Sequence, residues 1–157
     1  MVALSREALR QVRDAVSGYR QPTLATELSA AQIALKAAGV DVDVSQGIGA
    51  LDRKSEAVLG WVIREATTNV IRHSGAKHCQ IVLCQTDDQL QVEVLNDGWR
   101  VVQQAAGNGL PGLQERLASI GGTLEASPLP DAGFRLRATI RESMSAGPVQ
   151  NAAEVVA

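Results

Sequence analysis

The chain is predicted to fold as a two-layer α/β sandwich, in which a mixed, mostly antiparallel sheet of about five strands carries helices on one face. Two observations predict this fold. Long segments repeat apolar residues with the period of a helix, and short runs between them alternate apolar and polar residues or are rich in β-branched ones. At 157 residues the chain is long enough for one domain with a real core and a short appendage.

Composition excludes several classes of function. The chain is 45% hydrophobic and 20% charged with a net charge of −2, which is ordinary for a globular protein and gives no footprint for direct nucleic-acid binding. No apolar run of membrane-spanning length and no signal peptide is present, so we expect a cytoplasmic segment without membrane contact. Cys79 and Cys84 have odd spacing on a predicted strand and are interpreted as free thiols.

Two helices are predicted in the first quarter of the chain. Residues 4–17 form a short amphipathic helix whose apolar stripe is narrow, so it needs a partner helix from another chain or a second copy. Gly18 and Pro22 end it. Thr23 caps a second helix over residues 24–38, in which four positions are expected to be apolar contacts: Leu28, Ala31, Ile33 and Leu35.

The longest helix is expected from Arg53, capped by Asp52, to Ser74. One stripe of this helix is apolar: Leu59, Val62, Ile63, Ala66 and Val70. A polar flank beside it gathers four side chains, because spacings of three, four, seven and eight residues return to nearly the same side of a helix: Glu65, Asn69, Arg72 and His73. These groups suit a metal-chelated polyphosphate, although a Glu/Asn/Arg edge is also what a solvated helix face looks like.

The strands are also predicted from the pattern of apolar and polar residues. Residues 40–44 alternate as a half-buried strand, and residues 79–85 and 89–96 form a hairpin that ends in Asn96-Asp97-Gly98. Residues 99–108 show no period and are expected to be a mobile loop. A helix over residues 112–120 and a strand pair at 123–126 and 134–140 complete the domain, and residues 143–157 are expected to be a disordered tail.

A glycine-rich stretch precedes the helix expected at residues 112–120. Gly107, Gly109 and Gly112 allow close backbone approach to a ligand, and the helix start offers unpaired N–H groups. No Gly-Lys-Ser/Thr follows, as a Walker A loop requires, and the stretch does not directly follow a strand, as a Rossmann fingerprint does. By itself such a loop is equally compatible with a simple helix start.

The combination of three boxes is more specific. Asn69, then Asn96-Asp97-Gly98, then Gly107-x-Gly109-Leu110-x-Gly112 resembles the nucleotide boxes of the GHKL ATP-binding (Bergerat) fold. Within it, the segments around Glu65–Ser74 and Gly109–Leu117 resemble the sensor histidine kinases of the NarX/DesK type. The resemblance divides the chain into residues 1–22 (the end of a dimerisation helix and a linker), 23–142 (an HATPase catalytic, ATP-binding domain) and 143–157 (the tail).

The resemblance implies roles for the site residues. Asn69 would coordinate Mg²⁺ on the ATP phosphates, Glu65 would act as catalytic base or polariser, and Arg72 would approach phosphate. His73 would lie beside the ribose or adenine, and Gly98 would let the strand end pass close to the base. The glycine box, Gly107, Gly109, Leu110 and Gly112, would form the phosphate-side loop and the hinge of an ATP lid at residues 99–108.

Two departures from the family pattern concern the nucleotide. Asn96 stands where the family has the aspartate that accepts a hydrogen bond from the adenine amine, so we expect its amide oxygen to accept that bond more weakly. Arg100 replaces the second glycine of that box, so the entry to the lid is less free. The neighbouring Asp97 is expected to point to the opposite face of the strand.

A third departure concerns the phosphoryl acceptor. The family's acceptor-histidine helix is missing, and neither His73 nor His78 is placed to replace it. The resemblance therefore implies a histidine kinase fragment that acts on a histidine of the parent kinase's dimerisation helices. It also implies a response regulator as partner, with a helix-turn-helix output domain in this family, and a homodimer. Two alternatives stay open: a GHKL serine kinase of the anti-sigma type, and a non-catalytic nucleotide-binding or dimerisation module.

Overall fold

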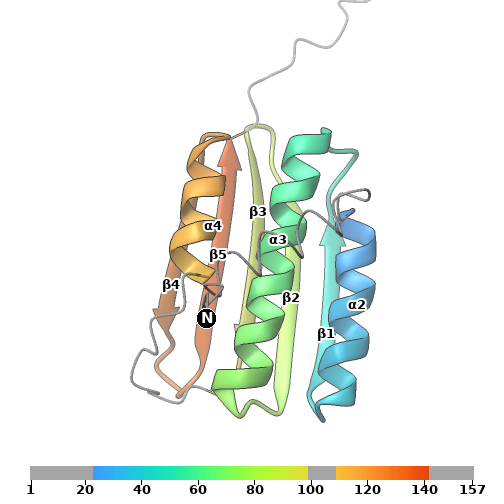
Figure 1. Ribbon diagram of the computed structural model, residues 1–157, viewed down its shortest axis with the longest axis vertical. Helices are drawn as coiled ribbons and strands as arrows, with labels where there is room; N and C mark the ends of the chain where they lie inside the picture. Colours follow the sequence, from blue (N-terminus) through green and yellow to red (C-terminus); the bar gives the residue numbers. More distant parts are fainter. Residues whose placement is uncertain (1–22, 99–108, 142–157) are drawn as a thin grey trace, which may run out of the picture.

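The computed structural model describes residues 23–98 and 109–141 (Figure 1). The predicted helix at residues 4–17, the loop at 99–108 and the tail at 143–157 lie outside the described residues. The elements follow in the order α2 (Leu24–Ala37), β1 (Asp41–Gly47), α3 (Arg53–Asn69), η1 (Val70–Ser74), β2 (His78–Gln85), β3 (Gln89–Asn96), α4 (Gly109–Ala118), β4 (Gly122–Pro128) and β5 (Phe134–Arg141).

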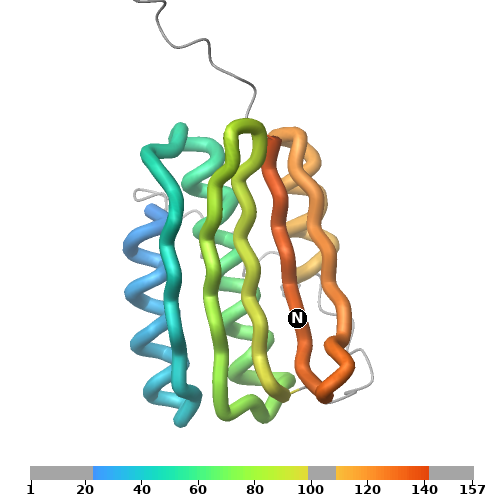
Figure 2. The backbone as a smooth tube through the Cα atoms, turned by 180° about the vertical axis from the view of Figure 1, so that it is seen from behind, coloured from blue at the N-terminus to red at the C-terminus, as the bar shows by residue number. Residues whose placement is uncertain are grey.

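The five strands form one mixed sheet in the order β1-β2-β3-β5-β4. β1 runs parallel to β2, and the other three pairings are antiparallel. Within the described residues, the three α-helices lie side by side on one face of the sheet (Figure 1), and none of them covers the opposite face (Figure 2). The predicted two-layer α/β sandwich is therefore confirmed. We call the uncovered side the open face.

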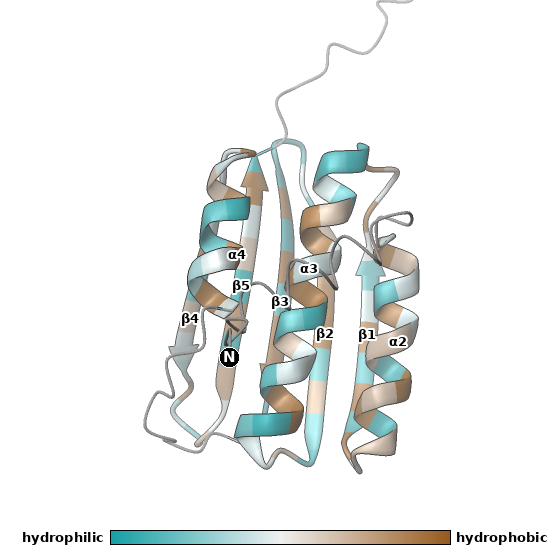
Figure 3. Cartoon of the chain, viewed as in Figure 1, coloured by the Kyte–Doolittle hydropathy of each residue, from teal (hydrophilic) through white to brown (hydrophobic). Residues whose placement is uncertain are grey.

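The core lies between the helices and the sheet. Strand residues alternate between the two faces, and β3 buries every second residue from Leu90 to Asn96 toward the helices. Figure 3 shows hydrophobic residues on both the helices and the strands. All five members of the apolar stripe predicted for the long helix, which the structure divides into α3 and η1, are buried: Leu59, Val62, Ile63, Ala66 and Val70.

Both predicted caps are confirmed. The Thr23 hydroxyl accepts a hydrogen bond from the N–H of Thr26, and the Asp52 carboxylate accepts one from the N–H of Ser55 at 2.9 Å. One expected core position on α2 is wrong, because Ile33 is 71% exposed. It lies on the outer side of the helix, since only one side of α2 meets the rest of the domain.

Two further boundaries differ from the expectation. α4 begins at Gly109 rather than at residue 112, so Gly109 and Gly112 belong to its first turn and not to a loop. The long helix changes to a π-helical turn over Val70–Ser74. A π turn holds more residues than an α turn, so the 3.6-residue spacing assumed for the polar flank applies only as far as Asn69.

Candidate nucleotide site

The predicted site residues that the structure describes lie on α3, on η1, at the end of β3 and in the first turn of α4. Gly98, just after β3, lies against the turn that follows η1. A β-carbon at Gly98 would stand 2.5 Å from the carbonyl oxygen of Ser74 and 2.6 Å from the nitrogen of Ala76. Both are backbone atoms that cannot swing away, so only glycine lets the strand end approach this turn.

Glu65 on α3 meets the first residue of α4. A β-carbon on Gly109 would stand 1.9 Å from Oε1 of Glu65 and 2.5 Å from its Cδ. The missing side chain of Gly109 therefore makes room for the carboxylate. The structure thus brings together Glu65 and Gly109, two residues that the sequence places far apart.

Asn69 is the last residue of α3, one helical turn after Glu65, and is half-buried. Its side chain forms no cap hydrogen bond with the π turn that follows. Arg72 and His73 lie within that turn and are exposed. Glu65 and Asn69 thus remain on a common side of α3. Because Arg72 and His73 lie in the π turn, their side chains point in other directions than a regular α-helix would give them.

Ser74 closes the π turn. Its buried hydroxyl donates to the carbonyl oxygen of Val70 at 2.6 Å and accepts from the N–H of Ala76 at 3.0 Å. Gly75, which follows, has the left-handed backbone angle φ of 63°. The side chain of Ser74 and the conformation of Gly75 together fix the direction in which the chain leaves the site.

Asn96 ends β3 on the helix-covered side of the sheet and is only 8% exposed. Its Oδ1 accepts a hydrogen bond from the N–H of Gly98 at 3.2 Å. Its cross-strand neighbours are Cys79 on β2 and Phe134 on β5. Burial raises the pKa of the Cys79 thiol to about 12, so this neighbour is uncharged near neutral pH.

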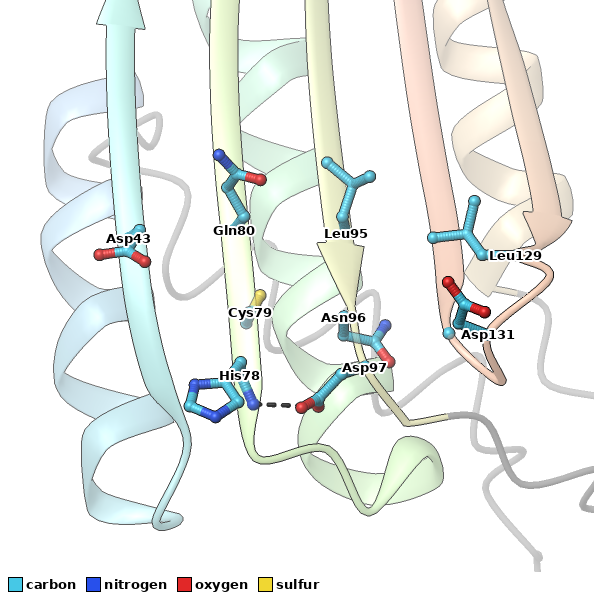
Figure 4. Close-up of a pocket in the computed structure, with 10 residues that line it drawn as sticks. Asp43, His78, Cys79, Gln80, Leu95, Asn96, Asp97, Leu129 and Asp131 are labelled. Carbon is cyan, nitrogen blue, oxygen red and sulfur yellow. Dashed lines mark hydrogen bonds between the residues drawn. The ribbon is translucent and has the colours of Figure 1, made fainter.

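Asp97 points away from Asn96, as expected, and holds the start of β2. Its Oδ1 accepts from the N–H of Lys77 at 2.8 Å and from that of His78 at 3.0 Å; the His78 bond is drawn in Figure 4. The backbone hydrogen bond from His78 is the main cause that lowers the pKa of this carboxyl below its usual range. Asp97 is therefore a structural residue.

A hollow of about 450 Å³ lies at this end of the open face of the sheet (Figure 4). Asp43, Gln80 and Leu95 contribute to it from three neighbouring strands, and Leu129 and Asp131 border it from the turn between β4 and β5. Of the predicted site residues that the structure describes, only Asn96 lines it. The hollow is thus on the other side of the sheet from Glu65 and Gly109.

The remaining residues of the glycine box divide between described and undescribed parts. Leu110 is half-buried and packs against the core, and Gly112 lies in the first turn of α4. Gly107 lies outside the described residues, as do Trp99, Arg100 and the predicted lid.

A stack of side chains joins the three helices beside the site. Glu27 on α2 accepts two hydrogen bonds from the guanidinium of Arg64 on α3, at 3.2 and 2.5 Å. The Cζ atoms of Arg64 and of Arg116 on α4 lie 4.7 and 4.8 Å from the centre of the Trp61 ring. We call these four residues the helix stack.

The helix stack accounts for the positions of two long side chains. Trp61 packs between helices, and the guanidinium of Arg116 lies over its ring. From the sequence, only the spacing of Trp61 and Arg64 indicates that these two residues lie within one helical turn of each other. No pattern in the sequence predicts Arg116 or Glu27 as their partners.

No preformed metal cluster exists among residues 23–98 and 109–141: nowhere do three His, Cys, Asp or Glu side chains converge as a cation site requires. Within the same ranges, every helix is too short or too polar to cross a membrane.

Comparisons with known proteins give the family. No family model matches the chain. It is 35% identical to the sensor histidine kinase YvfT of Bacillus subtilis over 130 residues, which are 81% of this chain and 35% of that protein. It is 32% identical over 156 residues to the sensor histidine kinase LnrJ of the same organism, covering 94% of this chain and 39% of that protein. The chain thus spans between a third and two fifths of these relatives.

Solved structures show the same fold. The histidine kinase domain of the blue-light activated histidine kinase of Erythrobacter litoralis superposes with a TM-score of 0.63 at 17% identity, covering 75% of this chain and 64% of that one. The catalytic domain of histidine kinase ThkA gives 0.61 at 14% identity, covering 76% and 92%. The sheet order, the helix layer and these similarities agree, and the chain belongs to the sensor histidine kinase family, as a catalytic domain with the GHKL-type α/β fold.

Proposed function

We propose that this domain binds Mg-ATP and transfers its γ-phosphoryl group to a histidine on another helix. The observation that carries the proposal is the meeting of Glu65 and Gly109, with Asn69 one turn further along α3. The Glu65 carboxylate then stands beside the start of α4, where unpaired N–H groups and the positive end of the helix dipole favour phosphate.

The residues fit a magnesium ion held mainly by its substrate. Mg²⁺ takes oxygen ligands and keeps several waters and phosphate oxygens in its shell, so one side-chain amide with a nearby carboxylate is enough. Asn69 would hold the ion. When bound, Mg²⁺ would neutralise part of the phosphate charge.

The other residues of the site have distinct proposed tasks. Glu65 would orient or accept the proton of the attacking group, since Gly109 leaves its carboxylate unobstructed. Arg72 and His73, exposed on the π turn, would contact phosphate and sugar. Gly98 and Asn96 would meet the base, and Gly107, Gly109, Leu110 and Gly112 would form the phosphate side of the site.

The same proposal covers the rest of the protein. Residues 1–22 would be the end of a dimerisation helix and its linker, residues 23–142 the catalytic domain, and residues 143–157 a tail. The acceptor histidine would belong to the dimerisation helices of the parent kinase, which would act as a homodimer in the cytoplasm, where ATP is available. The product phosphohistidine would pass its group to a response regulator.

Nucleotide binding is tested by calorimetry with ATP, in Mg²⁺ and in a chelator. We expect Asn69→Ala to lose most of the metal-dependent affinity, by about tenfold or more, because weaker second-sphere changes already cost that much. Thr68→Ala is the matched control, since the Thr68 hydroxyl only donates to the carbonyl oxygen of Arg64. Equal affinities of the parent and Asn69→Ala in Mg²⁺ would contradict the metal role.

Phosphoryl transfer is tested with γ-labelled ATP and a separate acceptor-helix domain of the parent kinase. The chain alone should not label itself, whereas the added domain should gain an acid-labile phosphoryl group. Glu65→Gln should retain ATP binding and lose transfer. Acid-labile label on His73 or His78 of the isolated chain would contradict the proposed acceptor. Binding without any transfer would instead favour the non-catalytic module.

A further inference from the structure

Glycine occupies most of one side of α4. Gly109, Gly112 and Arg116 are three and four residues apart, so they lie on one stripe of the helix. The buried Leu113 and Leu117 lie on a different stripe and hold α4 to the core. Glycine is disfavoured in helices and offers no side chain for packing. Of the three residues on the glycine stripe, only Arg116 can therefore fix the start of α4 against a neighbouring helix through its side chain.

Two contacts join this stripe to α3. A β-carbon on Gly109 would stand 1.9 Å from Oε1 of Glu65, and the Cζ atom of Arg116 lies 4.8 Å from the centre of the Trp61 ring. Trp61 and Glu65 are four residues apart and lie on one side of α3. The earlier residue of α3 thus meets the later residue of α4, so the two helices run antiparallel here. We call these four residues the α3–α4 seam.

The direction of the Arg116 side chain explains how both contacts form at once. Trp61 and Glu65 are separated by about 6 Å along α3, whereas Gly109 and Arg116 are separated by about 10 Å along α4. Long side chains on a helix lean toward its N-terminus. Arg116 therefore reaches back along α4 toward Gly109, and its reach covers the difference. A contact made in this direction resists sliding of α4 along α3.

The platform that Arg116 meets is itself fixed. The Cζ atom of Arg64 lies 4.7 Å from the centre of the Trp61 ring, and Glu27 on α2 accepts hydrogen bonds from the Arg64 guanidinium at 3.2 and 2.5 Å. Among the described residues Arg116 forms no ion pair of its own. Its guanidinium is held instead by the attraction of a cation to the face of the Trp61 ring.

We propose that Arg116 is a positioning residue for phosphoryl transfer. Its stacking on Trp61 sets the place of α4 along α3, and this place keeps Gly109 beside the Glu65 carboxylate. The inference rests on the proposed function, in which Glu65 acts on the attacking group and the start of α4 faces phosphate. Arg116 touches neither the nucleotide nor the acceptor histidine in this proposal and acts only through Trp61 and the helix that carries it.

The first test replaces Arg116 by alanine and by lysine. We expect single-turnover transfer to the added acceptor-helix domain, at saturating Mg-ATP, to fall about fivefold in Arg116→Ala, because small misplacements of reacting groups cost rate. Arg116→Lys should recover part of the loss, since an ammonium group is also attracted to the tryptophan ring. Arg53→Ala is the matched control, because it removes an exposed guanidinium at the end of α3 far from Glu65.

The second test asks whether Arg116 acts on the contact of Glu65 with Gly109. Alanine at position 109 already displaces the carboxylate, so adding Arg116→Ala to Gly109→Ala should reduce transfer by less than about twofold further. Thermal melts of all variants set an assay temperature at which each is folded. A role in stability alone would lower the melting temperature of Arg116→Ala and leave transfer by the folded chain unchanged.

The outcomes separate this inference from the proposed function. Unchanged transfer by folded Arg116→Ala, no recovery in Arg116→Lys, or an equal loss from Arg116→Ala with and without Gly109→Ala overturns the inference while the proposed function stands. A parent chain that binds no Mg-ATP, or binds it without any transfer, overturns the proposed function and the inference with it.

Discussion

The carboxylate of Glu65 occupies the space that a side chain at Gly109 would fill. A β-carbon there would stand 1.9 Å from Oε1 and 3.1 Å from Oε2. Contacts of this kind join a functional group on one helix to the first turn of another. Gly109 has a helical backbone conformation that any residue adopts, so backbone freedom does not explain the glycine. The space that the Glu65 carboxylate occupies explains it instead.

Gly109→Ala should therefore damage the site more than the fold. The clashing atoms are the far end of a flexible side chain, so the carboxylate can move away, and alanine is favoured over glycine in a helix by about 1 kcal/mol. We expect thermal unfolding to change by only a few degrees and phosphoryl transfer to fall by about tenfold or more. Single-turnover transfer and a thermal melt measure the two effects.

The control for this prediction is a double variant. Glu65→Ala removes the clashing group, so adding Gly109→Ala to it should stabilise the domain or leave its stability unchanged. A large loss of stability from Gly109→Ala in both backgrounds would show that the obstacle is backbone rather than the carboxylate.

Arg64→Ala should destabilise the domain through Glu27. The Glu27 side chain is only 10% exposed and would lose its positively charged partner. The 45% exposure of Arg64 reduces the stabilisation that this ion pair contributes. We expect a loss of roughly 1–3 kcal/mol in the free energy of unfolding in urea. Arg64→Ala in a Glu27→Gln background should lose less. Additive losses would show that the pair contributes nothing.

Arg116→Ala should change the fluorescence of Trp61. The guanidinium lies 4.8 Å from the ring centre, and its removal exposes that part of the ring to water. We expect a red-shifted emission and a loss of about 0.5–1 kcal/mol in stability, in a Trp99→Phe background that leaves Trp61 as the only tryptophan. Glu115→Ala serves as the neighbouring control. Emission identical to that of the parent would exclude the stacked arrangement in solution.

Asp97 should contribute to stability in a pH-dependent way. The backbone hydrogen bond from His78 lowers the pKa of Asp97 below its ordinary value of 3.8. A lowered pKa in the folded state gives stability that is present above pH 3.8 and is lost as the pH falls through the folded-state value. Urea unfolding from about pH 5 to about pH 2 should thus show a shallower loss of stability for Asp97→Asn than for the parent. The pKa of Asp52 is lowered as well, chiefly by its backbone hydrogen bond from Ser55, so part of the slope should remain.

The two cysteines should differ sharply in reactivity. Cys84 is exposed, whereas Cys79 is buried and burial raises its pKa to about 12. A thiol reagent near neutral pH should label one site in the native chain and two after unfolding. The Cys84→Ser variant is the control, and its rapid labelling in the native state would contradict the burial of Cys79.

Stability should also fall in alkali on account of Cys79. Its pKa is raised in the folded state, so the contribution of the neutral thiol is complete below the ordinary value of 9.0 and is lost as the pH rises toward about 12. Replacing Cys79 with alanine should flatten this part of the pH profile, whatever its effect at neutral pH. If stability falls with pH at the same slope in both proteins, groups other than Cys79 cause the loss of stability in alkali.

The sequence by itself determined which segments are helices and strands, and which residues could form a nucleotide site. Periodicity identified the buried stripe of α3, and the caps at Thr23 and Asp52 marked two helix starts, because these signals arise within a few consecutive residues. The three boxes similarly marked Asn69, Asn96 and the glycines by residue type and order along the chain.

Only the tertiary structure decided how those residues meet. The π turn after Asn69, the exposure of Ile33 and the start of α4 at Gly109 depend on what each segment packs against, which local periodicity does not encode. The contact of Glu65 with Gly109 and the placement of Arg116 over Trp61 join residues on different helices. The orientation of the Asn96 amide depends on a single N–H, that of Gly98, and a hydrogen-bond donor admits only one of the two ends of an amide.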